Sequence, residues 1–443
     1  MKKISTKVAL AVVCWAVVAA QAVAQMVGGV NYKIVSKTDK TAEVTWLVGD
    51  DDDPFADDPV YTGEVVIPEK VKIAGVDYTV VGVGKMAFAD ANLKKLTLPS
   101  TIKYAAWGSF WGAILPDKFV IPESIDSIGE NAFWGTNITT LDLSNVKSLQ
   151  ADAFNECKSL EKVVIGSKLD SIPYDCFASC VALKDITFPS TLKRIGRFAF
   201  MECNSLDSIM IPEGVVALEG YCFGKCEGAV KAVIPESVVE FGDGVLGACT
   251  KLTDVKLPSH LTVLPEFTFG YCASLQEYEV GDKVEKLGNE AFKYCLGLKS
   301  ITLPACLKEI GTDAFLKTPV LRTVVVKAQV PPTGAVFADT TYLEGTLFVP
   351  AGTLDAYKAA DGWSKFKNIQ EMEPTGITNA YAAEVKVVAV SGGVNVEAAT
   401  DAPVAVYAVN GTQEYAGKAG FIALNRGMHI VVIGKKAFKV VVK

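Results

Sequence analysis

The feature that most constrains this chain is an internal repeat of about 23 residues, a period typical of units that stack into an extended array. Seven cysteines recur at this constant interval: Cys157, Cys180, Cys203, Cys226, Cys249, Cys272 and Cys295. Phenylalanines keep the same period, with Leu246 in the one gap: Phe88, Phe110, Phe133, Phe154, Phe177, Phe200, Phe223, Phe269, Phe292 and Phe315. The register therefore holds over ten successive steps, which a chance arrangement of residues does not produce.

One unit shows how the repeat can fold. Ile186 and Phe188 are two residues apart, so both side chains lie on one face of a short strand, which the following proline ends because it lacks an N–H. Phe200, Cys203 and Leu206 then follow at intervals of three, which predicts a helical turn with its apolar side chains on one side. Such a unit cannot bury its apolar face alone, but stacked copies form a continuous core. The sequence therefore predicts an α/β solenoid with about 23 residues per unit.

The repeat can be written L-x-x-I-x-I-P-x-x-L-x-x-I-G-x-x-A-F-x-x-C, and it resembles the BspA-type leucine-rich repeat of bacterial surface proteins. The resemblance runs from about Val65 to Val326. It departs from the general leucine-rich repeat because a proline follows the strand and no asparagine ladder is present. The resemblance implies a curved solenoid with a parallel sheet on one face and a surface-exposed binding role, and it identifies no ligand.

The N-terminus has the pattern of a secretory signal peptide over residues 1–24. Three lysines flank the start of an apolar run over residues 8–20, and Ala22-Val23-Ala24 is a small-residue cleavage site. The run is too short to span a bilayer, and no other stretch is long and apolar enough for a transmembrane helix. We therefore expect an exported protein that is secreted or held at the cell surface.

The sequence predicts four further segments. They are an N-terminal β cap (residues 25–80), the leucine-rich repeat solenoid (81–326), a C-terminal cap (327–372) and a small all-β sandwich (380–443). Large apolar residues such as Tyr357 and Trp363 mark the C-terminal cap, where they are suited to cover the open end of the core. The run Glu373-Pro374-Thr375-Gly376 predicts a linker before the sandwich.

Residues 380–443 carry the pattern of several short strands. Apolar residues alternate at Val404 and Val406, and Asn410-Gly411 is a hairpin turn signal. The segment resembles the C-terminal sorting domains of type IX secretion substrates. That resemblance implies attachment to the outer surface of the cell, at the outer membrane. The alternative is a small β-sandwich with no sorting role.

Composition argues against several functional classes. The formal charge is −7, and removal of three lysines with the signal peptide takes it from −7 to −10, which disfavours a nucleic-acid partner. Only two histidines are present, His260 and His429, so little material exists for a catalytic relay or a His-rich metal site. The motifs of phosphate-binding loops, serine hydrolases and zinc proteases do not occur. The sequence therefore assigns no catalytic residue, no cofactor and no metal ligand, and predicts a protein that is not an enzyme.

The cysteine ladder has three interpretations. Units without the cysteine carry Ala91, Ala113, Thr136 and Thr318 at the same position. A position that accepts alanine, threonine or cysteine is a small buried slot, which favours packed thiols. Disulfides are the second interpretation, because the protein is expected to be exported. Zinc is the third, because the pairs Cys176/Cys180 and Cys222/Cys226 have C-x3-C spacing, although these pairs lie two units apart.

An acidic run extends from Asp50 to Asp58. Carboxylate oxygens suit Ca²⁺, but the spacing lacks the glycine and the final glutamate of an EF-hand loop. We expect a solvated loop between two strands of the N-terminal cap.

The candidate binding face is the row of residues at the centre of each strand, which project from the sheet between the inward positions. These ladder residues are Thr97, Val120, Asp142, Val164, Thr187, Met210, Val233, Lys256, Glu279, Thr302 and Val325. The stretch from Val164 to Val233 is apolar for an exposed row, and Lys256 and Glu279 change its character. An apolar centre with a polar edge suits protein recognition. The alternative is a face that simply carries β-forming residues.

These features predict a non-enzymatic secreted or cell-surface scaffold that binds host or bacterial surface proteins, as in adhesion. The alternative function is glycan binding in polysaccharide capture. Trp107, Trp111 and Trp134 lie outside the core pattern, and exposed tryptophans stack on sugar rings.

Overall fold

The computed structural model describes residues 24–46 and 60–372, and residues 385–442 with gaps at 391–392, 399–403, 409–411, 419 and 434–435. The chain forms two compact units, Met1–Glu371 and Met372–Lys443. Several predicted features fall outside the described residues: the signal peptide up to Val23, the acidic run 50–58, the linker 373–376 and the Asn410-Gly411 turn. In the described ranges, no helix is long and apolar enough to cross a membrane.

The first unit begins with six strands that form a cap: β1 (Gln25–Val27), β2 (Val30–Ser36), β3 (Thr41–Thr45), β4 (Thr62–Val66), β5 (Lys70–Ile73) and β6 (Val76–Val83). β1, β2 and β3 pair antiparallel, β3 pairs parallel with β6, and β5 forms an antiparallel hairpin with β6. Tyr32 and Tyr61 lie in the buried core of this cap. Because β6 also pairs with the first short strand of the repeat, the cap continues directly into the solenoid.

Each coil of the solenoid contributes up to two short strands, which belong to two different parallel sheets. The strands that correspond to the predicted sheet, called sheet-face strands, are β7 (Asn92–Thr97), β10 (Thr140–Asp142), β12 (Lys162–Val164), β14 (Asp185–Thr187), β16 (Ser208–Met210), β18 (Lys231–Val233), β20 (Asp254–Lys256), β22 (Glu277–Glu279), β24 (Ser300–Leu303) and β26 (Thr323–Val326). Equivalent residues pair in register from coil to coil, for example Lys231 with Asp254. The predicted solenoid, with its parallel sheet and its repeat period, is confirmed.

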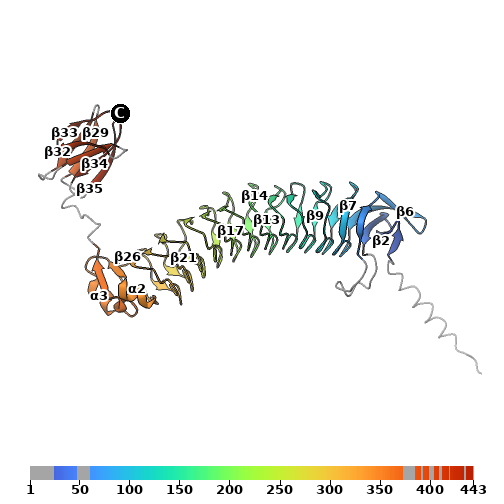
Figure 1. Cartoon of the computed structure of the whole chain (residues 1–443), viewed down its shortest axis with the longest axis horizontal. Helices are drawn as coiled ribbons and strands as arrows, with labels where there is room; N and C mark the ends of the chain where they lie inside the picture. The colour runs from blue at the N-terminus through green and yellow to red at the C-terminus, as the bar shows by residue number, and fades with distance from the viewer. Residues whose placement is uncertain are drawn as a thin grey trace, which may run out of the picture. The chain divides into compact units, whose positions relative to one another are not determined.

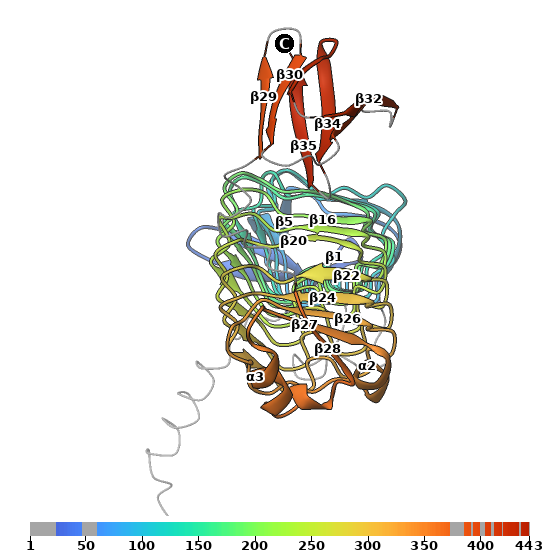
Figure 2. The same cartoon turned by 90° about the vertical axis from the view of Figure 1, so that its left-hand side faces the viewer.

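A second set of strands was not predicted. Its members are two residues long: β8 (Tyr104–Ala105), β9 (Ser127–Ile128), β11 (Ser148–Leu149), β13 (Ser171–Ile172), β15 (Arg194–Ile195), β17 (Ala217–Leu218), β19 (Glu240–Phe241), β21 (Val263–Leu264), β23 (Lys286–Leu287) and β25 (Glu309–Ile310). Figure 1 shows the coils of the first unit side by side in chain order along a gently bent array. Figure 2 looks along the array and shows sheet-face strands from β16 to β26 one below another.

The second set of strands is interrupted between β11 and β13 and between β19 and β21. In intact coils, the residue after the short strand donates its N–H to the coil before, as Gly196 does to the Ile172 carbonyl at 2.8 Å. Pro173 and Pro265 occupy this position at the two interruptions. Since proline has no N–H to donate, it accounts for both breaks.

The segment that leads to each cysteine is not the helical turn that the residue spacing predicted. Consecutive turns replace it, in which the Cys203 N–H donates to the Phe200 carbonyl at 3.3 Å. Phe198 and Glu202 have φ angles of 59° and 63°, which no helix contains. Alternate N–H groups donate to the next coil, as from Phe200 to the Cys222 carbonyl at 2.9 Å, so the backbone is satisfied without a helix.

The repeated phenylalanines form one column through the core. Neighbouring rings lie 4.8–5.5 Å apart wherever phenylalanines follow in successive coils. Phe200 is fully buried, and it stacks on both neighbouring rings at 5.3 and 5.2 Å. Leu246 occupies the same slot and is also fully buried, so it interrupts the aromatic column but not the packing.

The C-terminal end of the solenoid is covered by α2 (Asp339–Glu344), β27 (Thr346–Val349), α3 (Leu354–Ala359), the 3₁₀ turn η1 (Trp363–Lys365) and β28 (Asn368–Glu371). β27 pairs with β26 and β28 pairs with β27, both parallel, so they extend the sheet face. Tyr357 and Trp363 are fully buried, and they donate hydrogen bonds to the Ala328 and Pro332 carbonyls at 2.8 and 2.7 Å. These large side chains close the apolar core.

The second unit consists of antiparallel strands: β29 (Val385–Val390), β30 (Gly393–Ala398), β31 (Val404–Ala408), β32 (Gln413–Gly417), β33 (Gly420–Ala423), β34 (Gly427–Ile433) and β35 (Lys436–Val442). They form the sheets β29-β30-β33 and β32-β31-β34-β35. Side chains of both sheets share one core: Val394, Val396, Val404, Val406, Ile422, Val431 and Val440. The buried His429 lies between Glu414, 2.5 Å from its Nδ1, and the Asn425 carbonyl, 2.9 Å from its Nε2.

Candidate functional site

The structure places the predicted ladder residues on the exposed side of the sheet-face strands, in separate groups. In-register pairing joins Asp142 with Val164 and Thr187, Met210 with Val233 and Lys256, and Glu279 with Thr302 and Val325. Thr97 lies in β7, which pairs with β4, and Val120 lies in a coil that has no sheet-face strand. The ladder is therefore divided by gaps where neighbouring strands do not pair.

Apolar ladder residues are accessible and lie among charged neighbours. Val120 is 65% exposed and Met210 is 51% exposed, while Val233 is half-buried. On the same face, Lys231 forms an exposed ion pair with Asp254 at 2.9 Å. Exposed ion pairs of this kind add little stability, so these charges remain available to a partner.

Each gap in the sheet face coincides with an aromatic residue at an inward strand position. From residue 96 to residue 349 the inward positions otherwise carry valine, isoleucine, leucine or alanine. The exceptions are Phe119, Phe188 and Tyr278, whose rings lie 6.2, 5.9 and 4.8 Å from a ring of the phenylalanine column. An aromatic ring between strand and column takes more room than an aliphatic side chain in a close-packed core. The strands beside two of these rings remain paired on their other sides, β14 with β12 and β22 with β24, so each gap is confined to one edge.

The gap between β20 and β22 contains a cleft of about 550 Å³. Val255 and Tyr278 line it and are half-buried, whereas their equivalents Ala232 and Ile301 are fully buried. Burial nevertheless raises the pKa of the Tyr278 hydroxyl. The charged residues that line the cleft are Lys256, Glu279, Asp282 and Lys283. A second, smaller cleft of about 210 Å³ lies between the coil of Val120 and β10.

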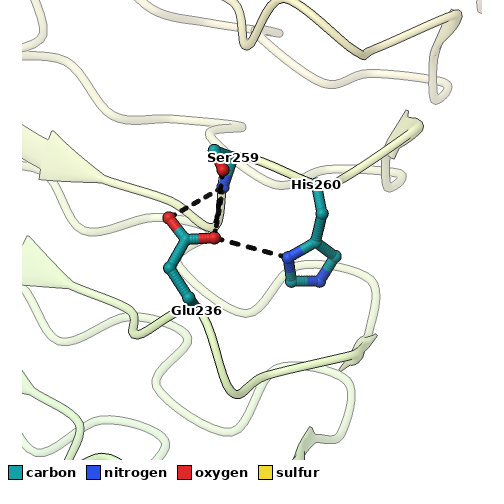
Figure 3. A network of polar contacts seen from close by, with 3 residues as sticks. All are labelled: Glu236, Ser259 and His260. Atoms are coloured by element: carbon teal, nitrogen blue, oxygen red, sulfur yellow. Dashed lines mark hydrogen bonds and ion pairs between the residues drawn. The ribbon is translucent and has the colours of Figure 1, made fainter.

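Glu236 holds the loop that follows β20 against the coil before it. Its carboxylate accepts hydrogen bonds from the Ser259 N–H at 3.0 Å and the Ser259 hydroxyl at 3.1 Å, and His260 Nδ1 lies 3.4 Å away (Figure 3). The bond from the Ser259 N–H holds the pKa of Glu236 below its usual range. These residue types match a catalytic triad, but Ser259 and His260 both face the carboxylate instead of each other (Figure 3). The arrangement fixes a loop and does not activate a nucleophile.

The cysteine ladder is a column of buried, free thiols. Each Sγ–H donates to a carbonyl of the coil before, as from Cys226 to Phe200 at 3.3 Å. Burial raises the pKa of Cys157, Cys249 and Cys295 to about 12, which keeps these thiols protonated and unreactive at neutral pH. Among the described residues, no group of three His, Cys, Asp or Glu is placed to hold a metal ion. The geometry favours packed thiols over the disulfide and zinc interpretations.

The predicted tryptophans come together on the turn face, the surface formed by the turn segments that lead to the cysteine positions. Trp111 stacks on Trp134 at 4.7 Å and lies 6.1 Å from Trp107. Lys85 Nζ lies 5.3 Å from the centre of the Trp107 ring. All three tryptophans are half-buried, so each presents part of its ring to solvent.

The turn face also carries an aromatic strip that was not predicted from the sequence. It consists of Tyr174, Phe198, Tyr221, Phe267, Tyr271 and Tyr294, with consecutive rings 4.5–6.0 Å apart. Glycine makes room for it, since a Cβ at Gly247 or Gly270 would lie 2.6 Å from the Phe267 ring. Phe198 and Tyr221 are one repeat period apart, so the repeat register is the signal that reveals the strip.

Comparisons with known proteins agree with this geometry. A family model described as "BspA type Leucine rich repeat region (6 copies)" matches residues 81–206 and 193–322, more than half of the chain. A leucine-rich repeat protein from Bacteroides ovatus aligns with a TM-score of 0.54 at 21% identity, over 79% of this chain and 100% of that one. The pneumococcal vaccine antigen PcpA aligns with a TM-score of 0.51 at 17% identity, over 80% of this chain and 99% of that one. At these identities the two structures show the fold alone. No curated protein matches the sequence.

Proposed function

Because this chain belongs to the BspA-type leucine-rich repeat family, we propose that it is an exported, non-enzymatic scaffold that binds proteins at the cell surface. The observation that carries the proposal is the sheet face. It presents the accessible apolar residues Val120 and Met210, which are 65% and 51% exposed, among solvated charges. An apolar centre with a polar surround is the usual composition of a protein-binding surface.

A binding role also fits the surroundings of the residues whose side chains are capable of chemistry. His260 faces a carboxylate that ties two coils together, and the buried His429 lies between Glu414 and a backbone carbonyl. The ladder thiols are buried and protonated, so they are poor nucleophiles.

The test is retention of extracellular-matrix, plasma or bacterial surface proteins on the immobilised, purified chain. We expect at least one protein to be retained at micromolar concentration and to be released by an excess of soluble chain. Retention of no protein at that concentration would contradict the proposal.

Export and surface attachment form part of the proposal. The signal pattern of residues 1–24 would direct export, and the second unit, as a type IX sorting domain, would attach the protein to the outer membrane. Deletion of residues 380–443 should move the protein from the cell surface to the periplasm. Unchanged surface exposure of the shortened chain would exclude the sorting role but leave the binding role intact.

Glycan binding is a second candidate function, and one observation favours it. Trp107, Trp111 and Trp134 form a partly exposed cluster, and stacked aromatic faces are typical of sugar-binding platforms. A glycan array probed with the chain, with Trp111→Ala and Trp134→Ala as comparisons, tests it. Binding that disappears in both variants supports a polysaccharide ligand, whereas no binding or unchanged binding excludes it.

A further inference from the structure

We propose that the cleft between β20 and β22 binds an extended peptide segment of a partner protein, which hydrogen-bonds to unpaired backbone groups of the strand edges that line it. The proposal rests on the protein-binding function above and states the form in which one partner segment binds. It is carried by three features of the cleft: unpaired backbone edges, an open apolar floor and an unbalanced charge at the rim.

The two strand edges lack the backbone bonds that join other coils. Ile234 N donates to the Lys256 carbonyl at 2.9 Å, and Val280 N donates to the Thr302 carbonyl at 3.0 Å. The equivalent bond, from Leu257 N to the Glu279 carbonyl, is not formed within residues 60–372. In the same range β20 pairs only with β18, and β22 pairs only with β24. Unpaired strand edges are templates for an added strand, whose main-chain hydrogen bonds supply affinity.

The gap is confined to the sheet face, because the same two coils remain joined elsewhere. β21 pairs with β23 in the second sheet. On the turn face, Phe267 N donates to the Asn289 carbonyl and Phe269 N to the Ala291 carbonyl, both at 2.9 Å. The coils are thus held on two sides, so the opening exists before a ligand arrives, which limits the entropy lost on binding.

The floor of the cleft is apolar and open. Val255 and Tyr278 are half-buried there, and a volume of about 550 Å³ lies within the usual range of ligand pockets, ~300–1,000 Å³. Successive side chains of a strand point to opposite faces. Every second side chain of a bound peptide would therefore cover this floor, and we expect apolar residues at those positions.

The rim determines the charge of the remaining peptide residues. Lys327 forms ion pairs with Glu279 at 2.7 Å and Asp282 at 3.8 Å, which balance the acidic side. Lys256 has no ion-pair partner among the described residues. An outward-facing acidic residue on the peptide would supply one, so alternating apolar and acidic residues form the expected ligand.

The test is selection of a phage-displayed library of random peptides, about twelve residues long, on the full chain. A selected peptide is then synthesised and titrated against the wild-type protein and two variants. Tyr278→Ile places in β22 the residue type that β24 carries at the equivalent position, Ile301. We expect β22 of this variant to pair with β20 and so close the gap. Phe188→Ile is the matched control, because it makes the same kind of change at the gap between β14 and β16.

We expect Tyr278→Ile to weaken peptide binding at least tenfold, about 1.4 kcal/mol, and Phe188→Ile to change it less than twofold. Lys256→Glu, which leaves the core untouched, should also weaken an acidic peptide. Amide hydrogen exchange of residues 255–257 and 277–279 should slow on peptide binding. Failure to select a peptide, equal affinity for wild type and Tyr278→Ile, or unchanged exchange would overturn the proposal. The scaffold function would still stand if Tyr278→Ile retained the matrix or plasma partner of the wild type.

Discussion

Phe200→Ala should be among the most destabilising single substitutions in the solenoid. The ring is fully buried and stacks on neighbours at 5.3 and 5.2 Å, so truncation leaves a cavity inside the column. Phenylalanine-to-alanine changes in cores cost about 3–5 kcal/mol, and this value includes aromatic contacts of ~0.5–1.5 kcal/mol each. Urea unfolding followed by far-ultraviolet circular dichroism measures the total loss. Amide hydrogen exchange shows which coils lose stability. We expect the loss in the coils around Phe200, because each coil of a repeat array is stabilised by contacts with its neighbours.

Phe200→Leu is the matched control for this prediction. The chain itself uses leucine at the equivalent, fully buried position 246, so the slot accommodates that shape. We expect a cost of no more than about 1.5 kcal/mol. Equal losses for the alanine and leucine variants, or a loss below about 1.5 kcal/mol for alanine, would refute a tightly packed column.

Three further predictions follow from the cysteine ladder. Cys226→Ala should cost only about 1 kcal/mol, because the slot is small and holds alanine in early coils, and urea unfolding checks this value. If the ladder consists of free thiols, neither a reductant nor a chelator should change the melting temperature. A large fall in the melting temperature with reductant would support disulfides, and a large fall with chelator would support zinc. Stability should fall at alkaline pH: the pKa of Cys157, Cys249 and Cys295 is raised to about 12 in the folded chain, whereas unfolded thiols titrate near ~8.5. The unfolded chain therefore loses these protons first, so stability declines as the pH rises above about 9 and is unaffected at neutral pH. Replacement of one of these cysteines by alanine should make the decline less steep.

The coil register was readable from the sequence because one slot repeats in every unit. A fully buried slot such as that of Phe200 or Leu246 accepts only large apolar residues, so its period appears directly. The backbone of the turns was not readable. A spacing of three between Phe200 and Cys203 fits a helical turn and consecutive turns equally well. The difference lies in left-handed residues such as Phe198 and Glu202, which are not glycine and carry no signal of their conformation.

The candidate site was predictable only in part. The outward positions of the strands follow from strand periodicity, which predicts the exposed side on which Asp142, Met210 and Glu279 lie. The gaps were not foreseen, because Phe188 and Tyr278 satisfy the inward apolar pattern as well as the aliphatic residues of the paired strands do. In the second set of strands, Pro173 and Pro265 replace a donor that the repeat requires. These two prolines are visible in the sequence, so the breaks in the second set of strands could have been predicted from it.

Protein binding through the sheet face is tested most directly by the affinity of a retained matrix or plasma protein for two surface variants of the chain. One variant combines Met210→Lys with Val233→Lys on the sheet face, and the other combines Tyr174→Ala with Tyr271→Ala on the turn face. These positions are all at least partly exposed, so both variants should fold, which circular dichroism checks. We predict that the sheet-face variant raises Kd at least tenfold, whereas the turn-face variant stays within twofold of the wild type. Wild-type affinity in the sheet-face variant, together with loss of binding in the turn-face variant, would contradict this assignment.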